Sequence, residues 1–120
     1  MIVSPAEMRC LCEYMGLSAK WLAARWGVTD YSVQRWERNR ILPDSLAQDL
    51  ADLEVEFNQI VAREIERRAD VILVPRTDDE ALEGKPAAWW RAIAHRVRED
   101  TDAMIVYYSD DVRVDHEPQA

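Results

Sequence analysis

The sequence predicts a mainly α-helical protein with a small α/β part. The first observation is that residues 1–43 contain three short segments with helical apolar spacing, each preceded by a capping residue. The second is a longer amphipathic segment over residues 44–70. The third is a strand pattern, a helix pattern and another strand pattern within residues 71–109. Residues 110–120 are charged and are expected to form a flexible tail.

The first helix is expected to begin at Pro5, a residue that suits the first position of a helix. Ser4 can cap this helix, and Glu7 is the partner that a capping box requires three residues later. Gly16 should end the helix, because glycine readily adopts the left-handed conformation found at helix C-termini.

Two further short helices are expected in the N-terminal segment. Ser18 caps the first of them, Ala19–Trp26, which Gly27 ends. Thr29 caps the second, which runs from Asp30 to about Arg38. The positions expected to face inward are small or apolar, namely Leu22, Ala23, Trp26, Val33 and Trp36.

A long helix should follow, from Asp44 to about Ala69. Its apolar positions recur at a 4-3-4-3 spacing and are Leu46, Leu50, Leu53, Phe57 and Ile60. At 1.5 Å per residue, about 25 residues give a helix of about 38 Å. A headpiece of 43 residues is too small to cover that apolar face. The long helix therefore needs the C-terminal segment or a second copy of itself to pack against.

The C-terminal segment reads as strand, helix, strand. Val71–Val74 is a β-branched run that predicts a buried strand, and Thr77–Lys85 reads as an acidic, solvated loop. A helix is expected over Ala87–Glu99, and Ala103–Tyr108 reads as a second strand. A strand–helix–strand unit predicts parallel strands. Two strands alone form a marginal sheet, which would gain by joining the strands of a second chain.

Charge is distributed unevenly along the chain, whose net charge is −8. Residues 1–43 hold six Lys and Arg against four acidic residues, whereas residues 44–120 hold nine against nineteen. This asymmetry suits an N-terminal part that faces phosphate and a remainder that faces solvent or protein. No run of about 18–20 apolar residues predicts a membrane helix, and no secretory leader is evident. We therefore expect a cytoplasmic protein with no membrane partner.

No constellation of residues predicts an enzyme, a cofactor or a metal site. Cys10 and Cys12 lie two residues apart on a helix and so point to different faces, where they can neither bridge each other nor share a metal ion. Other conspicuous residues have plain structural interpretations: the acidic run Asp78-Asp79-Glu80 as a solvated loop, His95 as a surface or core histidine, and the pair Trp89-Trp90 as core or dimer packing.

The segment Ser18–Pro43 has the layout of a helix-turn-helix, with a helix, a short turn at Gly27 and a second helix of about nine residues. It resembles the helix-turn-helix of the Cro/CI (XRE-type) phage repressors. The positions in register are Leu22-Ala23, Gly27-Val28-Thr29, Val33, Trp36-Glu37 and Pro43. Two positions depart from the family. Ala19 stands where a DNA-contacting Gln is usual, and Asn39 replaces a Gly but can still adopt a left-handed conformation.

The order of elements along the whole chain is similar to that of the YdiL-like proteins and of the anti-CRISPR-associated autorepressors of phages, in which the C-terminal part forms the dimer. These resemblances imply a sequence-specific transcriptional regulator, a dimeric repressor that binds a palindromic operator in double-stranded DNA. The modest positive charge of one headpiece also favours a dimer that spans half-sites about 34 Å apart. The long helix or the strands could form that dimer.

The register of the motif implies which residues read DNA, because the N-terminal residues of the second helix meet base edges in the major groove. Arg35 suits guanine and Gln34 suits adenine. Tyr31 can pack on a thymine methyl or bond a phosphate, Asp30 can accept from a cytosine amine or simply cap the helix, and Ser32 lies at the margin. Phosphate contacts are expected from the flanking residues Ser18, Lys20, Arg38, Asn39 and Arg40.

A different function remains open at the level of the sequence. The same type of headpiece occurs in antitoxins, which bind their own promoter and cover a toxin protein with another part of the chain. The tail from Ser109 to Ala120 has no apolar segment of the kind that a disordered antitoxin tail presents. The sequence therefore favours the operator-binding repressor.

Overall fold

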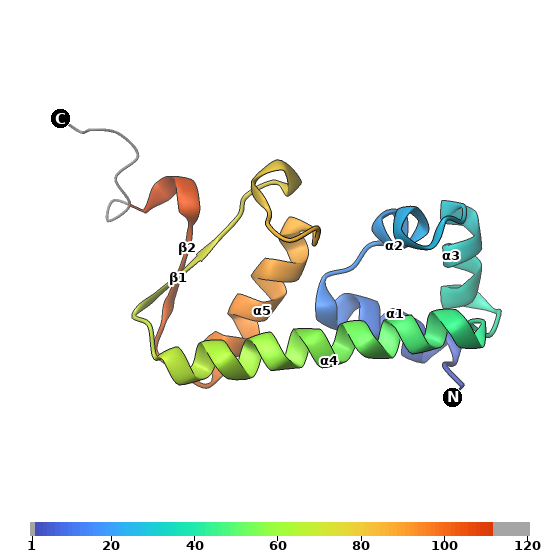
Figure 1. Ribbon diagram of the computed structural model, residues 1–120, viewed down its shortest axis with the longest axis horizontal. Coiled ribbons are helices and arrows are strands. Elements are labelled where there is room, and N and C mark those ends of the chain that lie inside the picture. Colours follow the sequence, from blue (N-terminus) through green and yellow to red (C-terminus); the bar gives the residue numbers. More distant parts are fainter. Residues whose placement is uncertain (1, 112–120) are drawn as a thin grey trace. The chain divides into compact units, whose positions relative to one another are not determined.

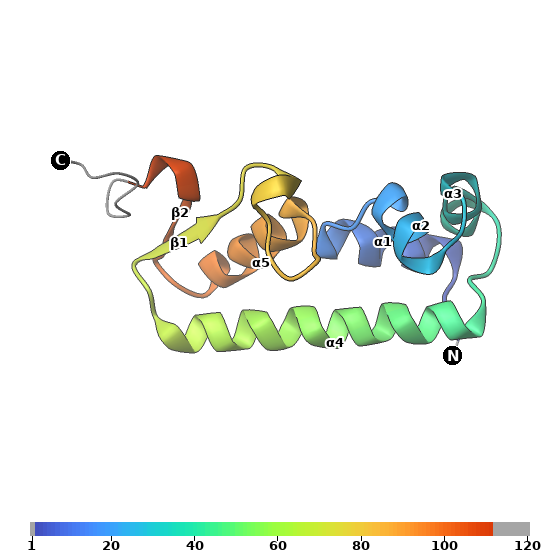
Figure 2. The ribbon, with the colours of Figure 1, turned by 45° about the horizontal axis from the view of Figure 1, so that its top comes forward.

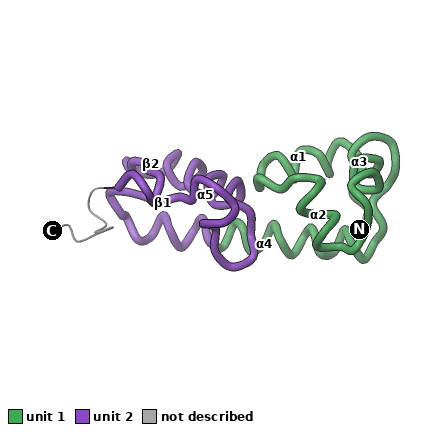
Figure 3. The backbone as a smooth tube through the Cα atoms, turned by 90° about the horizontal axis from the view of Figure 1, so that it is seen from above, with its two compact units in different colours: residues 1–59 green, residues 60–120 purple. Residues whose placement is uncertain are grey.

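The computed structural model describes residues 2–111. These residues form a mainly helical structure with one small parallel sheet of two strands, as the sequence predicts. The chain divides into two compact units, the first ending at Gln59 and the second beginning at Ile60 (Figure 3). The division falls inside the long helix α4 (Asp44–Arg67), which contributes to both units (Figure 1).

The first unit contains three short helices and the first part of α4. They are α1 (Pro5–Met15), α2 (Ala19–Trp26) and α3 (Asp30–Arg38), with the boundaries that the capping signals predict. Each contributes to an apolar core whose fully buried side chains include Met8, Met15, Leu22, Val33, Leu42, Leu50, Leu53 and Phe57. The three helices and the N-terminal part of α4 thus share one core.

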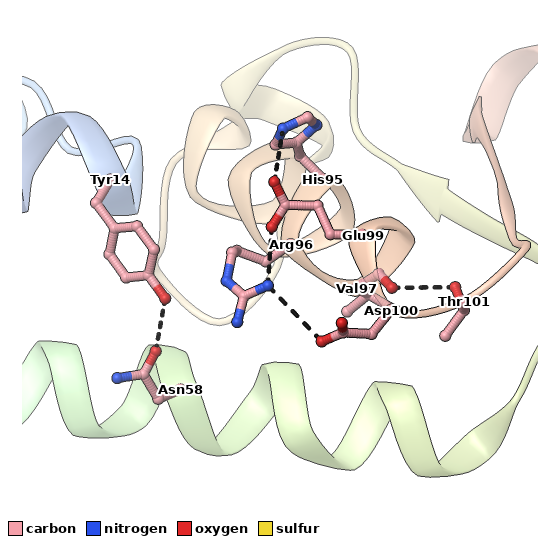
Figure 4. A network of polar contacts seen from close by, with 8 residues as sticks. All are labelled: Tyr14, Asn58, His95, Arg96, Val97, Glu99, Asp100 and Thr101. Carbon is pink, nitrogen blue, oxygen red and sulfur yellow. Dashed lines mark hydrogen bonds and ion pairs between the residues drawn. The ribbon is translucent and has the colours of Figure 1, made fainter.

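A local capping box fixes the start of α1, and a contact near its other end joins the helix to α4. The backbone N–H of Ser4 donates to Oε1 of Glu7 at 3.0 Å, and the N–H of Glu7 donates to Oγ of Ser4 at 3.1 Å. This is the predicted capping box. Near the other end, Tyr14 joins α1 to α4: its hydroxyl donates to Oδ1 of Asn58 at 2.8 Å (Figure 4), and its ring lies 4.8 Å from that of Phe57.

The second unit contains the predicted strand–helix–strand arrangement. Strand β1 (Val71–Val74) pairs in parallel with β2 (Met104–Tyr107), with Val71 opposite Met104. The connection between them carries α5 (Ala87–Glu99), and Figure 2 shows the helix beside the two strands. In β1 only Val74 is buried, whereas the other three residues are half-buried. The prediction of a buried strand therefore holds only in part, because a strand with one described neighbour keeps an open edge.

The buried face of α5 is centred on Trp89, which is 0% exposed, together with Ile93 and Val97. The predicted interpretation of Trp89 as a core residue is confirmed. Trp90, the other member of the pair, is only half-buried, and its Nε1 donates to the carbonyl of Leu82 at 3.2 Å. The helix thus buries Trp89 of this pair, whereas Ile93, Ala94 and Val97 are buried as the helical spacing predicts.

The C-terminal end of α5 carries polar side-chain contacts between neighbouring turns. Oε1 of Glu99 lies 2.9 Å from Nη1 of Arg96, and Oε2 of Glu99 lies 3.6 Å from Nε2 of His95 (Figure 4). The side chain of His95 is 73% exposed, so it is a surface histidine. Thr101 closes the helix by donating from Oγ1 to the carbonyl of Val97 at 3.0 Å.

The loop between β1 and α5 is more structured than predicted. It contains a 3-10 turn, Asp78–Glu80, whose residues are exposed. Oδ1 of Asp78 accepts from the backbone N–H of Ala87 at 2.8 Å, at the start of α5. Oε1 of Glu80 accepts from the N–H of Arg76 at 2.8 Å. The exposed side chains of Asp78 and Glu80 therefore also form hydrogen bonds with backbone amides at the two ends of the loop.

The structure also places the first residues of the predicted tail. A 3-10 turn, Tyr108–Asp110, follows β2, and Asp111 is buried. Nη2 of Arg76 lies 2.8 Å from Oδ2 of Asp110, and its guanidinium lies 4.0 Å from the ring of Tyr107. Asp110 and Asp111 are thus part of the second unit. The rest of the predicted tail, residues 112–120, lies outside the described residues.

Candidate nucleic-acid interface

Helices α2 and α3 are joined by a turn of three residues that begins at Gly27. Gly27 has φ 68° and ψ 34°, and its N–H donates to the carbonyl of Ala23. A Cβ atom at Gly27 would meet nothing within 4 Å, so glycine is favoured here by the left-handed backbone and not by lack of space. At the end of the turn, Oγ1 of Thr29 accepts from the N–H of Ser32 at 3.1 Å and caps α3.

One face of α3 carries four long polar side chains. At 100° per residue, Tyr31, Gln34, Arg35 and Arg38 fall within about 100° of each other, on the side opposite the buried Val33. Tyr31 is 59% exposed, Gln34 and Arg38 are exposed, and Arg35 is half-buried. We call these four residues the α3 stripe. It contains all three of the residues to which the sequence assigns most of the base reading.

Two other predicted contact residues of α3 lie outside the stripe. The hydroxyl groups of Ser32 and Thr29 are hydrogen-bonded at 3.0 Å, which ties Ser32 to the N-terminal cap. On the helical wheel Ser32 lies away from the stripe. Asp30 is exposed in the first turn of α3, beside Tyr31. The structure therefore brings Asp30 to the edge of the stripe and gives Ser32 a structural role.

The predicted phosphate-binding residues occupy the ends of α2 and α3. Ser18 caps α2, because its Oγ accepts from the N–H of Trp21 at 3.0 Å. Lys20 in the first turn of α2 and Arg40 beyond the end of α3 are both exposed. Asn39 has φ −153°, so it does not adopt the left-handed conformation that asparagine allows. Helix α3 ends without a left-handed residue, because the amides of Asn39 and Arg40 both donate to the carbonyl of Arg35 at 2.9 Å.

The basic residues of the first unit fall into two groups. Arg9 pairs with Glu13 at 3.4 Å, and Arg25 pairs with Asp49 at 2.7 Å. The remaining cations form no ion pair with any residue that the structure describes, and they are Lys20, Arg35, Arg38 and Arg40. All four belong to the predicted interface. The structure thus leaves this surface with the uncompensated positive charge of the unit.

Sequence reasoning missed the acidic residue that organises α2. Asp49 of α4 accepts from Nε of Arg25 at 2.7 Å and from Nη2 of Arg25 at 3.0 Å, and it also accepts from Nε1 of Trp26 at 2.7 Å. The hydrogen bond to Asp49 raises the pKa of Arg25 above its ordinary value. No spacing rule links Arg25 and Trp26 to Asp49, because a turn and the helix α3 separate them in the sequence. The polar flank of α4 was the one sequence feature that could have indicated such a contact.

The two cysteines are separated, as their spacing predicts. Cys10 is exposed and Cys12 is buried in the core. Burial, together with the nearby carboxylates of Glu37 and Glu13, raises the pKa of Cys12 to about 12. Within residues 2–111, no three or more His, Cys, Asp or Glu side chains come together as ligands for a metal ion. In the same part of the chain, no helix combines the length and the apolar character needed to cross a bilayer.

Comparisons with known proteins add no family to this description. No protein-family model matches the chain, and no curated protein matches its sequence. The interface is therefore interpreted from its own residues.

Proposed function

We propose that this protein is a sequence-specific DNA-binding transcriptional regulator, a homodimeric repressor that acts in the cytoplasm on a palindromic operator. In this proposal α2 and α3 form a helix-turn-helix of the XRE type. The observation that carries it is the charge pattern of the first unit: its four cations without an ion pair among the described residues all lie on or next to α2 and α3, two of them in the α3 stripe. A surface with these charges can contact the phosphate backbone of DNA while the stripe faces a groove.

Base reading falls on the α3 stripe in this proposal. The planar fork of Arg35 can bond O6 and N7 of guanine together, and Gln34 can bond adenine in the same bidentate manner. Tyr31 offers an exposed ring to a thymine methyl group. Asp30, at the edge of the stripe, can accept from a cytosine amine. These residues occupy the N-terminal two-thirds of α3, which is the part of a recognition helix that meets base edges.

Phosphate contacts position the protein on the duplex in this proposal. Lys20, Arg38 and Arg40 supply cations at the two ends of the interface, and Asn39 supplies a polar side chain beside them. Ser18 uses its hydroxyl oxygen to cap α2 and keeps its proton for a phosphate oxygen. The unpaired amides in the first turn of α2 add a partial positive charge, in the place where Ala19 lacks the polar side chain of the related family.

Charge is also the argument for a dimer. Residues 1–59 hold six basic and nine acidic side chains, because α4 adds acidic residues to the mildly basic headpiece. A single unit should therefore bind DNA weakly, whereas a two-fold dimer would apply two sets of four cations to one operator. The second unit offers a means of pairing, since within residues 2–111 each strand of its sheet has only one neighbour.

The proposal is tested by selecting binders from a pool of random duplexes with the full-length protein. The expected result is a palindromic consensus with half-sites about 34 Å apart, bound with an affinity that falls steeply as salt is raised. Sedimentation at micromolar concentration should give the mass of a dimer. Failure to enrich any sequence, with the protein folded, would exclude a sequence-specific regulator. Enrichment of a single unrepeated site by a monomer would exclude the dimer alone.

A further inference from the structure

Asp49 lies outside the α3 stripe, yet its contacts connect it to both helices of the proposed reading motif. We propose that Asp49 is a positioning residue that determines specificity: it sets the placement of α3 through Trp26 and withholds Arg25 from DNA. This inference rests on the proposed function and adds a residue of α4 to it. Two independent sets of contacts carry the argument, one through the indole of Trp26 and one through the guanidinium of Arg25.

The first set is a chain of contacts from α4 through α2 to α3. Oδ2 of Asp49 accepts from Nε1 of Trp26 at 2.7 Å, which fixes the direction of the indole. The ring of Trp26 in turn meets the ring of Trp36 edge-on, with centroids 6.2 Å apart and planes at 63°. Aromatic pairs favour this arrangement over an arbitrary one. Asp49 therefore defines the surface against which α3 rests, on the flank away from its exposed stripe.

The second set concerns the charge of Arg25. Both oxygens of Asp49 accept from the guanidinium, at 2.7 and 3.0 Å, in the bidentate geometry that arginine and carboxylate prefer. The guanidinium also lies 5.6 Å from the ring of Trp21. Arg25 is 37% exposed at its side chain and Asp49 28%, so the pair is at the surface but partly shielded. Asp49 thus balances the charge of Arg25 and engages its Nε and Nη2 donors.

The consequence for specificity follows from what a released Arg25 would do. An unpaired arginine in the last turn of α2 would be free to bond phosphate oxygens of any sequence, and so to raise the affinity for all DNA by a similar factor. Loss of the Trp26 contact would at the same time disturb α3 and weaken only the binding that depends on base edges. Removing the charge of Asp49 should therefore weaken specific binding and strengthen non-specific binding. Both effects lower the ratio of specific to non-specific affinity.

The experiment compares Asp49→Asn with Asp52→Asn in the full-length protein, using the selected duplex and a scrambled duplex of equal length. Asp52 is an exposed acid of α4 bonded only to Gln48 among the contacts described, so it is a matched control for charge. For Asp49→Asn we expect about tenfold weaker binding to the selected duplex. We also expect tighter binding to the scrambled duplex, with a salt dependence steeper by about one phosphate contact. Asp52→Asn should change both affinities by the same factor.

Two further variants separate the two sets of contacts. Trp26→Phe keeps a ring against Trp36 but removes the indole donor, so it should weaken specific binding and leave the salt dependence unchanged. The double variant Asp49→Asn with Arg25→Gln removes the released cation, so its affinity for the scrambled duplex should return to the wild-type value. Should Asp49→Asn be unfolded at the assay temperature, as judged by circular dichroism, Trp26→Phe decides the question.

Two results overturn the role of Asp49 alone. In one, Asp49→Asn and Asp52→Asn give the same specificity ratio. In the other, Trp26→Phe retains the ratio of the wild type. A wild-type protein that does not discriminate between the two duplexes overturns the proposed function, and the role of Asp49 with it. The two failures are thus distinguished by the wild-type protein.

Discussion

The guanidinium of Arg35 lies 5.5 Å from the centre of the Tyr31 ring, one turn earlier on α3. The contact is a cation–π interaction between two residues of the α3 stripe. It holds Arg35 along the helix surface without pairing its charge to a carboxylate. The guanidinium thus keeps its donors for the proposed contact with DNA, and the conformational freedom of its side chain is already reduced.

Arg35→Ala should abolish the preference for one base step in each half-site. A bidentate bond to guanine contributes about 1–3 kcal/mol of discrimination, so the correct base at that step should lose an advantage of about 5- to 150-fold. The measurement is a set of affinities for duplexes that differ only at that step. An unchanged preference at every step would contradict the role given to Arg35.

Arg38→Ala should behave differently, because we assign Arg38 to phosphate. Its loss should weaken binding to all sequences by a similar factor and reduce the slope of log affinity against log salt by about one. Arg9→Ala is the control, since Arg9 pairs with Glu13 outside the interface. If Arg38→Ala changed the sequence preference while leaving the salt slope intact, Arg38 would belong with the base-reading residues.

Thr29→Ala should lower the free energy of unfolding by about 1 kcal/mol, because it removes the N-cap of α3. Thr29 accepts from the amide of Ser32 at 3.1 Å and also contacts its hydroxyl at 3.0 Å. Ser45→Ala in the exposed first turn of α4 should change stability by less than about 0.5 kcal/mol. Urea unfolding of both variants provides the comparison, and equal losses would argue against the cap.

Gly27→Ala should cost about 1 kcal/mol through the backbone alone. The residue has φ 68°, which disfavours a Cβ, and no atom lies within 4 Å of the position of that Cβ. Gly27→Asn should cost less, since asparagine tolerates the left-handed conformation better than alanine. Thermal unfolding of the two variants checks the order. A larger loss for asparagine would mean that side-chain size limits the turn.

Alkaline pH should destabilise the first unit through Cys12. Burial raises the pKa of Cys12 from 9.0 to about 12, so the folded protein retains the thiol proton at a pH where the unfolded chain loses it. The stabilisation is fully present below about pH 9 and is lost as the pH rises toward 12, with a slope of at most about 1.4 kcal/mol per pH unit. Cys12→Ala should show a shallower slope than Cys10→Ala over this range. Parallel slopes would contradict the shift.

The boundaries of α1, α2 and α3 could be predicted because their signals are local. The box formed by Ser4 and Glu7 and the cap formed by Thr29 each involve residues three positions apart. Gly16 and Gly27 are also local signals, because glycine itself permits the positive φ angles found at these two helix ends. The α3 stripe followed from helical periodicity, once the buried position of Val33 was known.

Features that depend on tertiary contacts could not be predicted in this way. Trp89 and Trp90 are adjacent, and either could complete an apolar stripe on α5; packing selects Trp89. Asp49 contacts Arg25 and Trp26 across 24 and 23 residues, and no periodicity encodes such a pair. Asn39 is a local exception of another kind, since the sequence allows a left-handed residue there but α3 ends without one, with the amides of Asn39 and Arg40 sharing the carbonyl of Arg35.

The ratio of two affinities of the wild-type protein tests the central claim most directly. The first is for the duplex selected from a random pool, and the second is for its scrambled counterpart at the same salt concentration. The account predicts a ratio of at least about 10³, with both affinities falling as salt is raised. Equal affinities for the two duplexes, measured with folded protein, would contradict it.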